Sequence, residues 1–381
     1  MRSDANYNPA PKHKLKAAGI FQIPKKNQKG GQPMKIVVLC GGLSMERNVS
    51  LSSGTLICKA LRSMGHQAVL VDMFYGLEDY DGALEALFEA LPPLREVRVD
   101  QNAPDLDAVR ASRKWKNPSA VGRNVLELCM LADVVFLGLH GACGEDGRIQ
   151  AALDLLGVPY TGSGYLGSAL AMNKALTKQL AAQAGVRSPR GRTVRYGRAD
   201  IAEIVSETAL PCVVKPVDSG SSIGVSIAHT PEELTKALEE NLHLGLVLLE
   251  EYIRGREIDV GVLDGRALPS IEIIPKQGFY DYFNKYQAGA TVEITPAPLD
   301  AETERALGET ALKVHNCLGL KAYSRSDFIL TEQGEIYFLE INTLPGMTPT
   351  SLMPQEAAAA GVDYETLCQK VIDLALKDVN A

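Results

Sequence analysis

The sequence predicts an α/β protein of several domains, and three observations lead to this prediction. The chain has 381 residues, which is more than one ordinary hydrophobic core accommodates. Its first part alternates apolar strand-like runs with helical periodicity, a pattern typical of a mostly parallel sheet. Its last third is rich in strands. We therefore expect a disordered leader (residues 1–33) followed by three folded blocks, 34–171, 172–254 and 255–381.

The composition is that of a globular protein whose main partner is not a nucleic acid. Hydrophobic residues make up 46% of the chain, charged residues 22%, and the formal net charge is −7. Seven scattered cysteines without CxxC spacing predict reduced thiols in a cytoplasmic protein. Because no run of about 20 apolar residues occurs, we expect no membrane span. The leader is basic and lacks the apolar core of a signal peptide.

The first block begins with a strand at residues 35–40, whose continuous apolar run predicts burial on both faces. A glycine-containing loop and a helix follow, and further strands are expected at 66–73 and 132–141. Residues 76–125 are charged and less regular, so we interpret them as an insertion with some helix.

The second block begins with a helix over 172–185, which glycine and proline residues end. A strand over 211–216 leads into a loop of small residues at 218–228, which returns into another strand. A helix over 230–242 and a strand over 247–253 complete the block.

The third block is expected to contain strands at 257–265 and 267–275, a helix at 300–319, and a hairpin over 324–342. If the turn is centred on Gln333 and Gly334, the numbers of paired residues sum to about 667, as counted along a two-stranded antiparallel ladder. This count places Asp327 opposite Glu340.

The loop DSGSSIGVS, residues 218–226, could hold phosphates through its backbone N–H groups and the hydroxyls of Ser221 and Ser222. Lys215, at the end of the preceding strand, could reach the same phosphates. A plain flexible turn remains the alternative. The loop is not a P-loop, and GG at 41–42 is not a dinucleotide fingerprint.

The segment EEYIRGRE, residues 250–257, could present backbone groups to an adenine ring, and Glu257 could then bind ribose hydroxyls. From the residues alone, a solvated charged loop is the more favoured interpretation.

Three oxygen-bearing side chains, Asp327, Glu340 and Asn342, suggest a magnesium site. Glu340 and Asn342 are two apart, so they share one face of a strand. The alternative is a set of edge-strand acids in water, but the hydrophobic neighbours disfavour it because unpaired buried carboxylates are costly. Arg325 shares the face of Asp327 and could stabilise an anion there.

These segments together resemble a known family. The ordered motifs KPVDSGSSIGV, EEYIRGRE, SRSDF and EINTLPGMTPTSL are similar to those of ATP-grasp ligases. GGLSMERNVSL, LHGACGEDGRIQ, PYTGSGYLGSALAMNK and YDYFNKY resemble the D-alanine–D-alanine ligases more narrowly. The resemblance covers Met34 to the C-terminus. It implies a three-domain ATP-grasp fold, with ATP bound between the central and C-terminal domains, and a homodimer in the cytoplasm.

The resemblance implies that ATP phosphorylates one D-alanine to an acyl phosphate, which a second D-alanine attacks, for peptidoglycan precursor synthesis. The residues that it implies bind ATP are Lys174, Lys215, Ser221, Ser222, Glu250, Glu251, Ile253, Glu257 and Asn342. The lysines and serines would contact phosphates, residues 250–253 the adenine, and Glu257 the ribose. Two Mg²⁺ or Mn²⁺ ions would bind Asp327, Glu340 and Asn342.

For the amino acids, the resemblance implies that Glu46 binds the first ammonium group and that His140 lies beside it. Arg325 and the Gly346 amide would form the oxyanion site. The second carboxylate would bind at Ser351 and Leu352. Lys285 and Tyr286 would lie on a loop that closes the site, with Tyr286 hydrogen-bonded to Glu46 and Ser221.

Two departures and three alternatives accompany this resemblance. The family usually has Glu at Asn48 and Asp at Asn173, but neither is expected to be a ligand. A relative that uses D-lactate or D-serine second is the nearest alternative, although depsipeptide-forming relatives tend to lose the tyrosine that stands here at Tyr286. Another ATP-grasp carboxylate–amine ligase is the second alternative, and the segment GGLSMERNVSL argues against it. A non-catalytic nucleotide-binding protein is the third, but it should lack one of the ligands named above.

Overall fold

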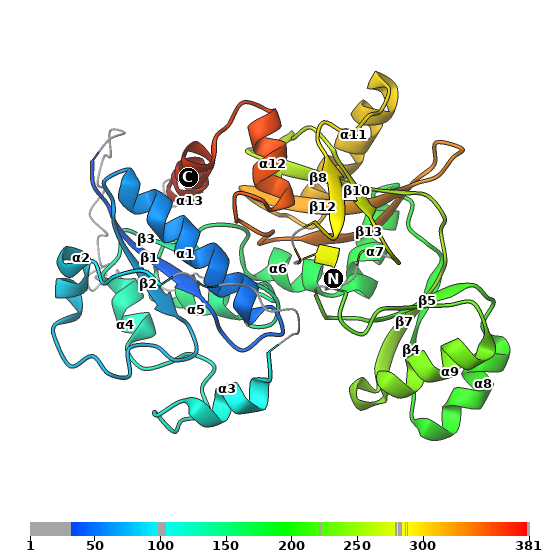
Figure 1. Ribbon diagram of the computed structural model, residues 1–381, viewed down its shortest axis with the longest axis horizontal. Helices are drawn as coiled ribbons and strands as arrows, with labels where there is room; N and C mark the ends of the chain where they lie inside the picture. Colours follow the sequence, from blue (N-terminus) through cyan, green and yellow to red (C-terminus); the bar gives the residue numbers. More distant parts are fainter. Residues whose placement is uncertain are drawn as a thin grey trace, which may run out of the picture. The chain divides into compact units, whose positions relative to one another are not determined.

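The computed structural model describes residues 32–95, 97, 104–220, 222–278, 280, 284–285, 287 and 289–378. The predictions for Ser221, Tyr286 and residues 1–31 of the leader fall outside the described residues. Within the described part, three sheets are present, and Figure 1 labels most of their strands.

A parallel three-stranded sheet is built from the first block, as predicted. Its strands are β1 (Lys35–Cys40), β2 (Gln67–Asp72) and β3 (Val134–Leu137), in the order β2-β1-β3. Helix α1 (Arg47–Ser63) connects β1 to β2 and packs on both. The remaining helices of this part are α2 (Leu87–Ala90), α3 (Leu106–Ser112), α4 (Val125–Met130), α5 (Arg148–Leu156) and α6 (Tyr165–Met172).

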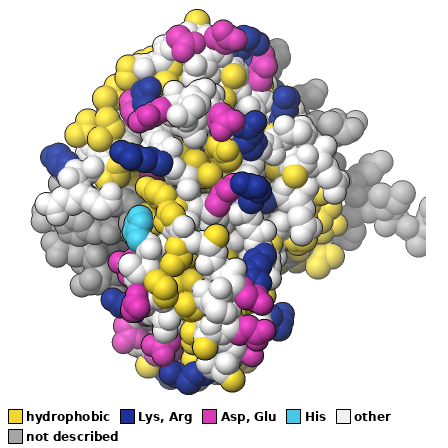
Figure 2. Space-filling view, turned by 90° about the vertical axis from the view of Figure 1, so that its right-hand side faces the viewer, with side chains coloured by type: hydrophobic (Ala, Val, Ile, Leu, Met, Phe, Trp, Pro, Cys, Tyr) yellow, Lys and Arg dark blue, Asp and Glu magenta, His cyan; other side chains and the backbone are white. Residues whose placement is uncertain are grey.

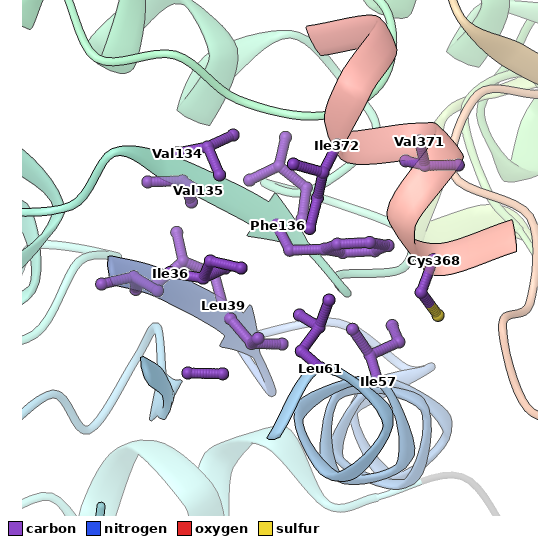
Figure 3. Packing of buried hydrophobic residues seen from close by; sticks show 14 of the residues in the cluster. Ile36, Leu39, Ile57, Leu61, Val134, Val135, Phe136, Cys368, Val371 and Ile372 are labelled. Atoms are coloured by element: carbon purple, nitrogen blue, oxygen red, sulfur yellow. The ribbon is translucent and has the colours of Figure 1, made fainter. Parts of the chain in front are cut away.

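The core of this sheet is completed by the last helix of the chain. Helix α13 (Tyr364–Asp378) buries Cys368, Val371 and Ile372 in the same cluster as strands β1 and β3. Figure 3 shows Phe136 of β3 between these side chains and those of α1. The predicted block 255–381 therefore contains a helix that packs on the sheet of the first block, whose strands lie far earlier in the chain.

The second sheet is antiparallel, with the order β4-β7-β5-β6. Its strands are β4 (Gly191–Arg195), β5 (Cys212–Pro216), β6 (Ser226–Ala228) and β7 (Leu246–Glu251). Helices α8 (Ile201–Glu207) and α9 (Pro231–Glu240) bury Ile204 and Leu234 in its core. Strand β4 and helix α8 were not predicted from the sequence.

The third sheet has six strands, in the order β11-β10-β8-β12-β13 with β9 beside β8. The strands are β8 (Arg256–Leu263), β9 (Arg266–Ala267), β10 (Ile271–Pro275), β11 (Thr291–Ile294), β12 (Tyr323–Leu330) and β13 (Ile336–Asn342). Helices α7 (Lys174–Gln183) and α11 (Ala301–Cys317) share its core, and α12 (Leu352–Ala359) packs on β8. Helix α7, expected with the second block, thus packs with the third sheet.

Three further findings concern the surface, the thiols and the apolar character of the helices. Figure 2 shows basic and acidic side chains interspersed with hydrophobic ones across one described face. All seven cysteines are free, and Cys143 is half-buried. Among the described residues, no helix is both long and apolar enough to span a bilayer.

Candidate active site

The hairpin of β12 and β13 sets the centre of the site. Asp327 lies opposite Glu340, as the sequence count predicted, and Arg325 lies opposite Asn342. The ladder shifts between Asp327 and Phe328, which pairs with Phe338, so Leu339 is the extra residue of a bulge. The bulge lets Phe338 face the core while Glu340 and Asn342 face the site.

Arg325 is held by two carboxylates at the centre of the third sheet. Its Nε and Nη2 donate to Asp327 at 3.0 and 3.1 Å, and its Nε lies 2.9 Å from Asp259 Oδ2 on β8. Burial and the nearby charge of Asp327 raise the pKa of Asp259 well above its usual range, although Arg325 opposes them. Sequence reasoning missed Asp259 because its importance lies in its contact with Arg325 on β12, which the order of the chain does not reveal.

Lys174, at the start of α7, reaches the same face. Its Nζ lies 3.2 Å from Glu340 Oε2 and donates to the carbonyl of Ser219 in the glycine loop. Burial alone would raise the pKa of Glu340, but Lys174, Lys285 and Lys215 lower it to about 2. Glu340 is therefore a carboxylate at neutral pH, as a cation ligand must be. Asn173 caps α7 by accepting from Leu176 N.

A second group of charges lies at the end of β7. Glu250 is buried, with Oε2 2.5 Å from Lys215 Nζ and Oε1 paired with Lys178 Nζ. Burial would raise the pKa of Glu250, but Lys215 and Lys178 lower it. Lys178 was missed because a single lysine on a polar helix has no distinctive sequence signal.

The other residues predicted to contact the adenine and the ribose lie at the end of β7, in the link to β8, and on β8. Glu251 ends β7 and accepts from the backbone N–H of Arg190 at 2.8 Å, whereas Ile253 lies in the link to β8. Glu257, on β8, faces Lys285, Asp327 and Glu340; burial raises its pKa to about 7, and Lys285 opposes this.

The N-terminal part contributes a buried histidine. His140 Nδ1 lies 3.0 Å from the carbonyl of Leu344, and Nε2 lies 3.1 Å from Ser53 Oγ. Burial lowers the pKa of His140, with Glu46 and the Leu344 carbonyl opposing. A neutral ring that donates from Nδ1 to the Leu344 carbonyl and accepts a hydrogen bond at Nε2 from the Ser53 hydroxyl satisfies both contacts.

Glu145 was also missed, although it ties two parts of the site together. Its Oε1 accepts from Leu344 N at 3.0 Å and its Oε2 from Gly141 N at 2.9 Å. Burial and the charge of Glu46 raise its pKa to about 8. The signal available was GEDG in the loop after β3, which lies within the motif LHGACGEDGRIQ.

One cavity of about 360 Å³ joins most of the predicted amino acid site. Its lining includes Glu46, His140, Lys285, Arg325, Asn342, Gly346, Ser351 and Leu352. A smaller cavity is lined by Lys174, Ser219, Gly220 and Glu340, and it shares Asn342 and Glu145 with the first. The two cavities therefore adjoin at the strand that ends in Asn342.

The far end of the cavity is formed by the turn into α12. Ser351 Oγ accepts from the backbone N–H of Thr348 at 3.1 Å, and α12 begins at Leu352. A Cβ atom at Gly346 would stand 2.9 Å from Ser351 Oγ, so a glycine fits this close approach. Above the site, Ser222 Oγ donates to the carbonyl of Tyr280 at 2.9 Å, which connects the glycine loop to the segment carrying Lys285.

The residues present fit a magnesium ion shared with phosphates. Asp327, Glu340 and Asn342 supply hard oxygen ligands, and Asn342 Nδ2 lies 3.3 Å from Asp327 Oδ2. Among the described residues, no three His, Cys, Asp or Glu side chains cluster tightly enough to hold a metal ion by themselves. Substrate oxygens would therefore have to complete the coordination.

Two family models match the chain. The model described as D-ala D-ala ligase N-terminus matches residues 35–163, and the one described as D-ala D-ala ligase C-terminus matches residues 188–373. Together they span the described strands β1 to β13.

Similar proteins carry the same name. A D-alanine–D-alanine ligase from Pediococcus pentosaceus is 39% identical over 89% of this chain and 97% of its own length. One from Geobacter sulfurreducens is 42% identical over 89% and 93%. The crystal structure of a D-alanine–D-alanine ligase from Bacillus anthracis complexed with ATP has a TM-score of 0.66 and 27% identity, covering 91% of this chain and 99% of that one. The chain described here therefore belongs to the D-alanine–D-alanine ligase family.

Proposed function

We propose that this protein joins two D-alanine molecules into D-alanyl-D-alanine, with ATP converted to ADP and phosphate. The observation that carries the proposal is the pair of adjoining cavities around β13. One is lined by Lys174 and the glycine loop, as a nucleotide phosphate site requires, and the other by Glu46, Arg325 and Ser351, as an amino acid site requires.

ATP is proposed to bind where Lys174 and Lys215 can reach its phosphates. The resulting attraction is strong because both ammonium groups are buried and little water screens them. Glu250, Glu251 and Ile253 are proposed to contact the adenine and Glu257 the ribose. The hydrogen bond from Ser222 to the Tyr280 carbonyl supports the proposal that Ser222, together with Ser221, holds the glycine loop over the phosphates.

Two Mg²⁺ or Mn²⁺ ions are proposed to bind Asp327, Glu340 and Asn342. When bound, such ions neutralise charge on phosphate oxygens and orient them for transfer. The low pKa of Glu340 supports the proposal because a carboxylate binds cations only when ionised.

In the first step, the carboxylate of the first D-alanine attacks the terminal phosphorus of ATP, and ADP leaves. Glu46 is proposed to hold its ammonium group beside neutral His140. Arg325 stabilises charge on the transferring phosphoryl group, since a fixed cation in a buried site needs no reorganisation during reaction.

In the second step, the amine of the second D-alanine attacks the carbonyl carbon of the acyl phosphate. The resulting oxyanion is proposed to face Arg325 and the N–H of Gly346, and the collapse of the intermediate releases phosphate. Ser351 and Leu352 would bind the second carboxylate at the N-terminus of α12, where backbone N–H groups favour an anion. The loop with Lys285 and Tyr286 would exclude water, which would otherwise hydrolyse the acyl phosphate.

We further propose that the protein acts in the cytoplasm, supplying peptidoglycan precursor synthesis, and that it is a homodimer. The exposed apolar side chains Leu155, Tyr165 and Leu166 on α5 and α6 support a subunit contact. Analytical ultracentrifugation would measure the mass, and a monomer at micromolar concentration would contradict the dimer.

The decisive experiment is product identification after incubation with ATP, Mg²⁺ and D-alanine. We expect one D-alanyl-D-alanine and one phosphate for each ADP formed. ADP release without dipeptide would overturn the proposal. A panel with D-serine and D-lactate as second substrates, at neutral pH, then tests the choice of nucleophile. Faster ADP release with D-lactate than with D-alanine would contradict it.

A further inference from the structure

We propose that Lys178 is a positioning residue that keeps Glu250 ionised and directed at the adenine ring when ATP is bound. This inference rests on the proposed function, because it assumes that ATP occupies the site between Lys174 and Glu250. Lys178 was not among the residues expected from the sequence or from the family resemblance.

Two buried lysines share one carboxylate in this part of the molecule. Lys178 follows Lys174 by four residues on α7, so both side chains lie on one face of the helix. Lys178 pairs with Oε1 of Glu250, while Lys215 from β5 pairs with Oε2. The side chain of Glu250 is 2% exposed and that of Lys178 10% exposed, so solvent compensates neither charge.

ATP would disturb this arrangement through its phosphates. Lys215 is proposed to contact the phosphates, and their larger negative charge would draw its ammonium group away from Glu250 Oε2. Without another cation, Glu250 would then be an unpaired buried carboxylate, which is strongly unfavourable. Lys178 removes that cost because it remains on Oε1.

The freed oxygen has a defined use. A carboxylate oxygen accepts hydrogen bonds and cannot donate them. Oε2 would accept from the 6-amino group of adenine, whereas guanine presents an acceptor oxygen at the same position and would be repelled. Lys178 therefore contributes both to ATP affinity and to the preference for ATP over GTP.

A double-mutant cycle tests the proposal in the full-length protein. Lys178→Met, Glu250→Gln and the double variant are titrated calorimetrically with Mg²⁺ and a non-hydrolysable ATP analogue at pH 6.5. Burial and the charge of Lys215 lower the pKa of Lys178 to about 7, although the charges of Glu250 and Glu340 oppose this shift. The titration pH lies below this pKa. Glutamine keeps an acceptor oxygen for adenine and needs no counter-ion.

We expect Lys178→Met to raise the Kd of the ATP analogue about 10-fold, the size of one charge-assisted hydrogen bond. The corresponding GTP analogue should lose less affinity, so the preference for ATP should shrink. In the Glu250→Gln background, Lys178→Met should change the Kd less than about 2-fold, because the partner charge is gone. An equal loss in both backgrounds would overturn the proposal, since Lys178 would then act on the phosphates directly.

Two controls separate this effect from general damage. Lys178→Arg keeps the charge and should restore binding to within about 3-fold. Lys236→Met removes an exposed lysine on α9, whose partner Glu240 lies 3.8 Å away, and should leave the Kd unchanged. Thermal unfolding of each variant reports its folded fraction. The product assay on the unmodified protein tests the ligase activity separately, so a failed cycle with normal dipeptide formation would refute the role of Lys178 alone.

Discussion

Buried carboxyl groups around the cavity differ widely in charge state because their neighbours differ. Lysines hold the pKa of Glu340 at about 2, whereas burial and Glu46 raise that of Glu145 to about 8. Among the described residues, backbone N–H groups are the hydrogen-bond partners of Glu145, and they compensate a charge less than a lysine does. Each carboxyl group is therefore suited to a different role.

Glu340→Gln should lower the rate of ADP release by about 100-fold or more, because one charged oxygen ligand of the proposed metal site is lost. The fold should persist, since the amide has the same shape. Coupled-enzyme detection of ADP measures the rate, and circular dichroism checks the fold. Glu332→Gln, in the exposed turn of the same hairpin, is the matched control and should be fully active. Unchanged turnover in Glu340→Gln would remove Glu340 from the metal site.

His315 should make the protein sensitive to acid. It is buried on α11, with Nδ1 2.7 Å from Ser324 Oγ, and burial lowers its pKa to about 4. Between pH 6.5 and 4 the unfolded chain binds a proton that the folded chain does not. Stability is therefore fully present above pH 6.5 and declines as the pH falls toward 4, by about 3 kcal/mol from this group.

Urea unfolding at several pH values measures this loss. His315→Asn keeps an amide near the Nδ1 position but does not titrate, so its stability should fall less over the same range. Parallel pH curves for the two proteins would show that His315 does not contribute.

At the residue scale, the sequence located side chains that stand in distinctive segments. Asp327, Glu340 and Asn342 could be found because polar residues interrupt apolar strands. Lys178 and Asp259 could not, since their importance lies in contacts between α7 and β7 or between β8 and β12, which the chain order does not reveal.

Secondary structure elements differ in how much of their stability is local. The predicted hairpin register was confirmed for the pair of Asp327 and Glu340, whose residue numbers sum to 667. Nearer the turn, the residue numbers of a pair such as Leu330 and Ile336 sum to one less than this predicted value. The extra residue of the bulge, Leu339, shifts the register by one residue and so accounts for this difference. Strand β4 escaped prediction because most of its residues are exposed and polar, and it is a strand only through pairing with β7.

Thr230→Ala should destabilise α9 by about 1 kcal/mol, the usual cost of losing an N-cap. Thr230 Oγ1 accepts from Glu233 N at 3.3 Å, and Pro231 follows as the first helical residue. Hydrogen exchange of peptides from residues 230–242 measures the effect. Thr235→Ala on the same helix is the control and should not destabilise it, because alanine favours a helix interior. Equal protection in Thr230→Ala and the unmodified protein would contradict the capping role.

The whole molecule is connected by the return of α13 to the first sheet. Leu367, Cys368, Val371 and Ile372 are completely buried there, although more than half of the chain separates them from β1. The sequence could predict an N-terminal sheet but not this partner, because a buried helix face fits any apolar surface of suitable shape.

Ile372→Ala should cost about 2–5 kcal/mol, as expected for a large-to-small change in a packed core. The loss should appear at β1 and β3, so peptides from 35–40 and 134–137 should exchange hydrogen faster. Asp373→Ala, at the exposed neighbour, should leave both peptides protected. Faster exchange confined to α13 itself would contradict a shared core.

The position of α13 also has a consequence for synthesis. A nascent chain that has emerged as far as β3 still lacks the helix that covers Phe136. The first sheet must therefore remain partly uncovered until α13 has been translated and has left the ribosome. Its apolar face is then available to chaperones, and a premature stop codon anywhere before α13 leaves that face exposed in the released product.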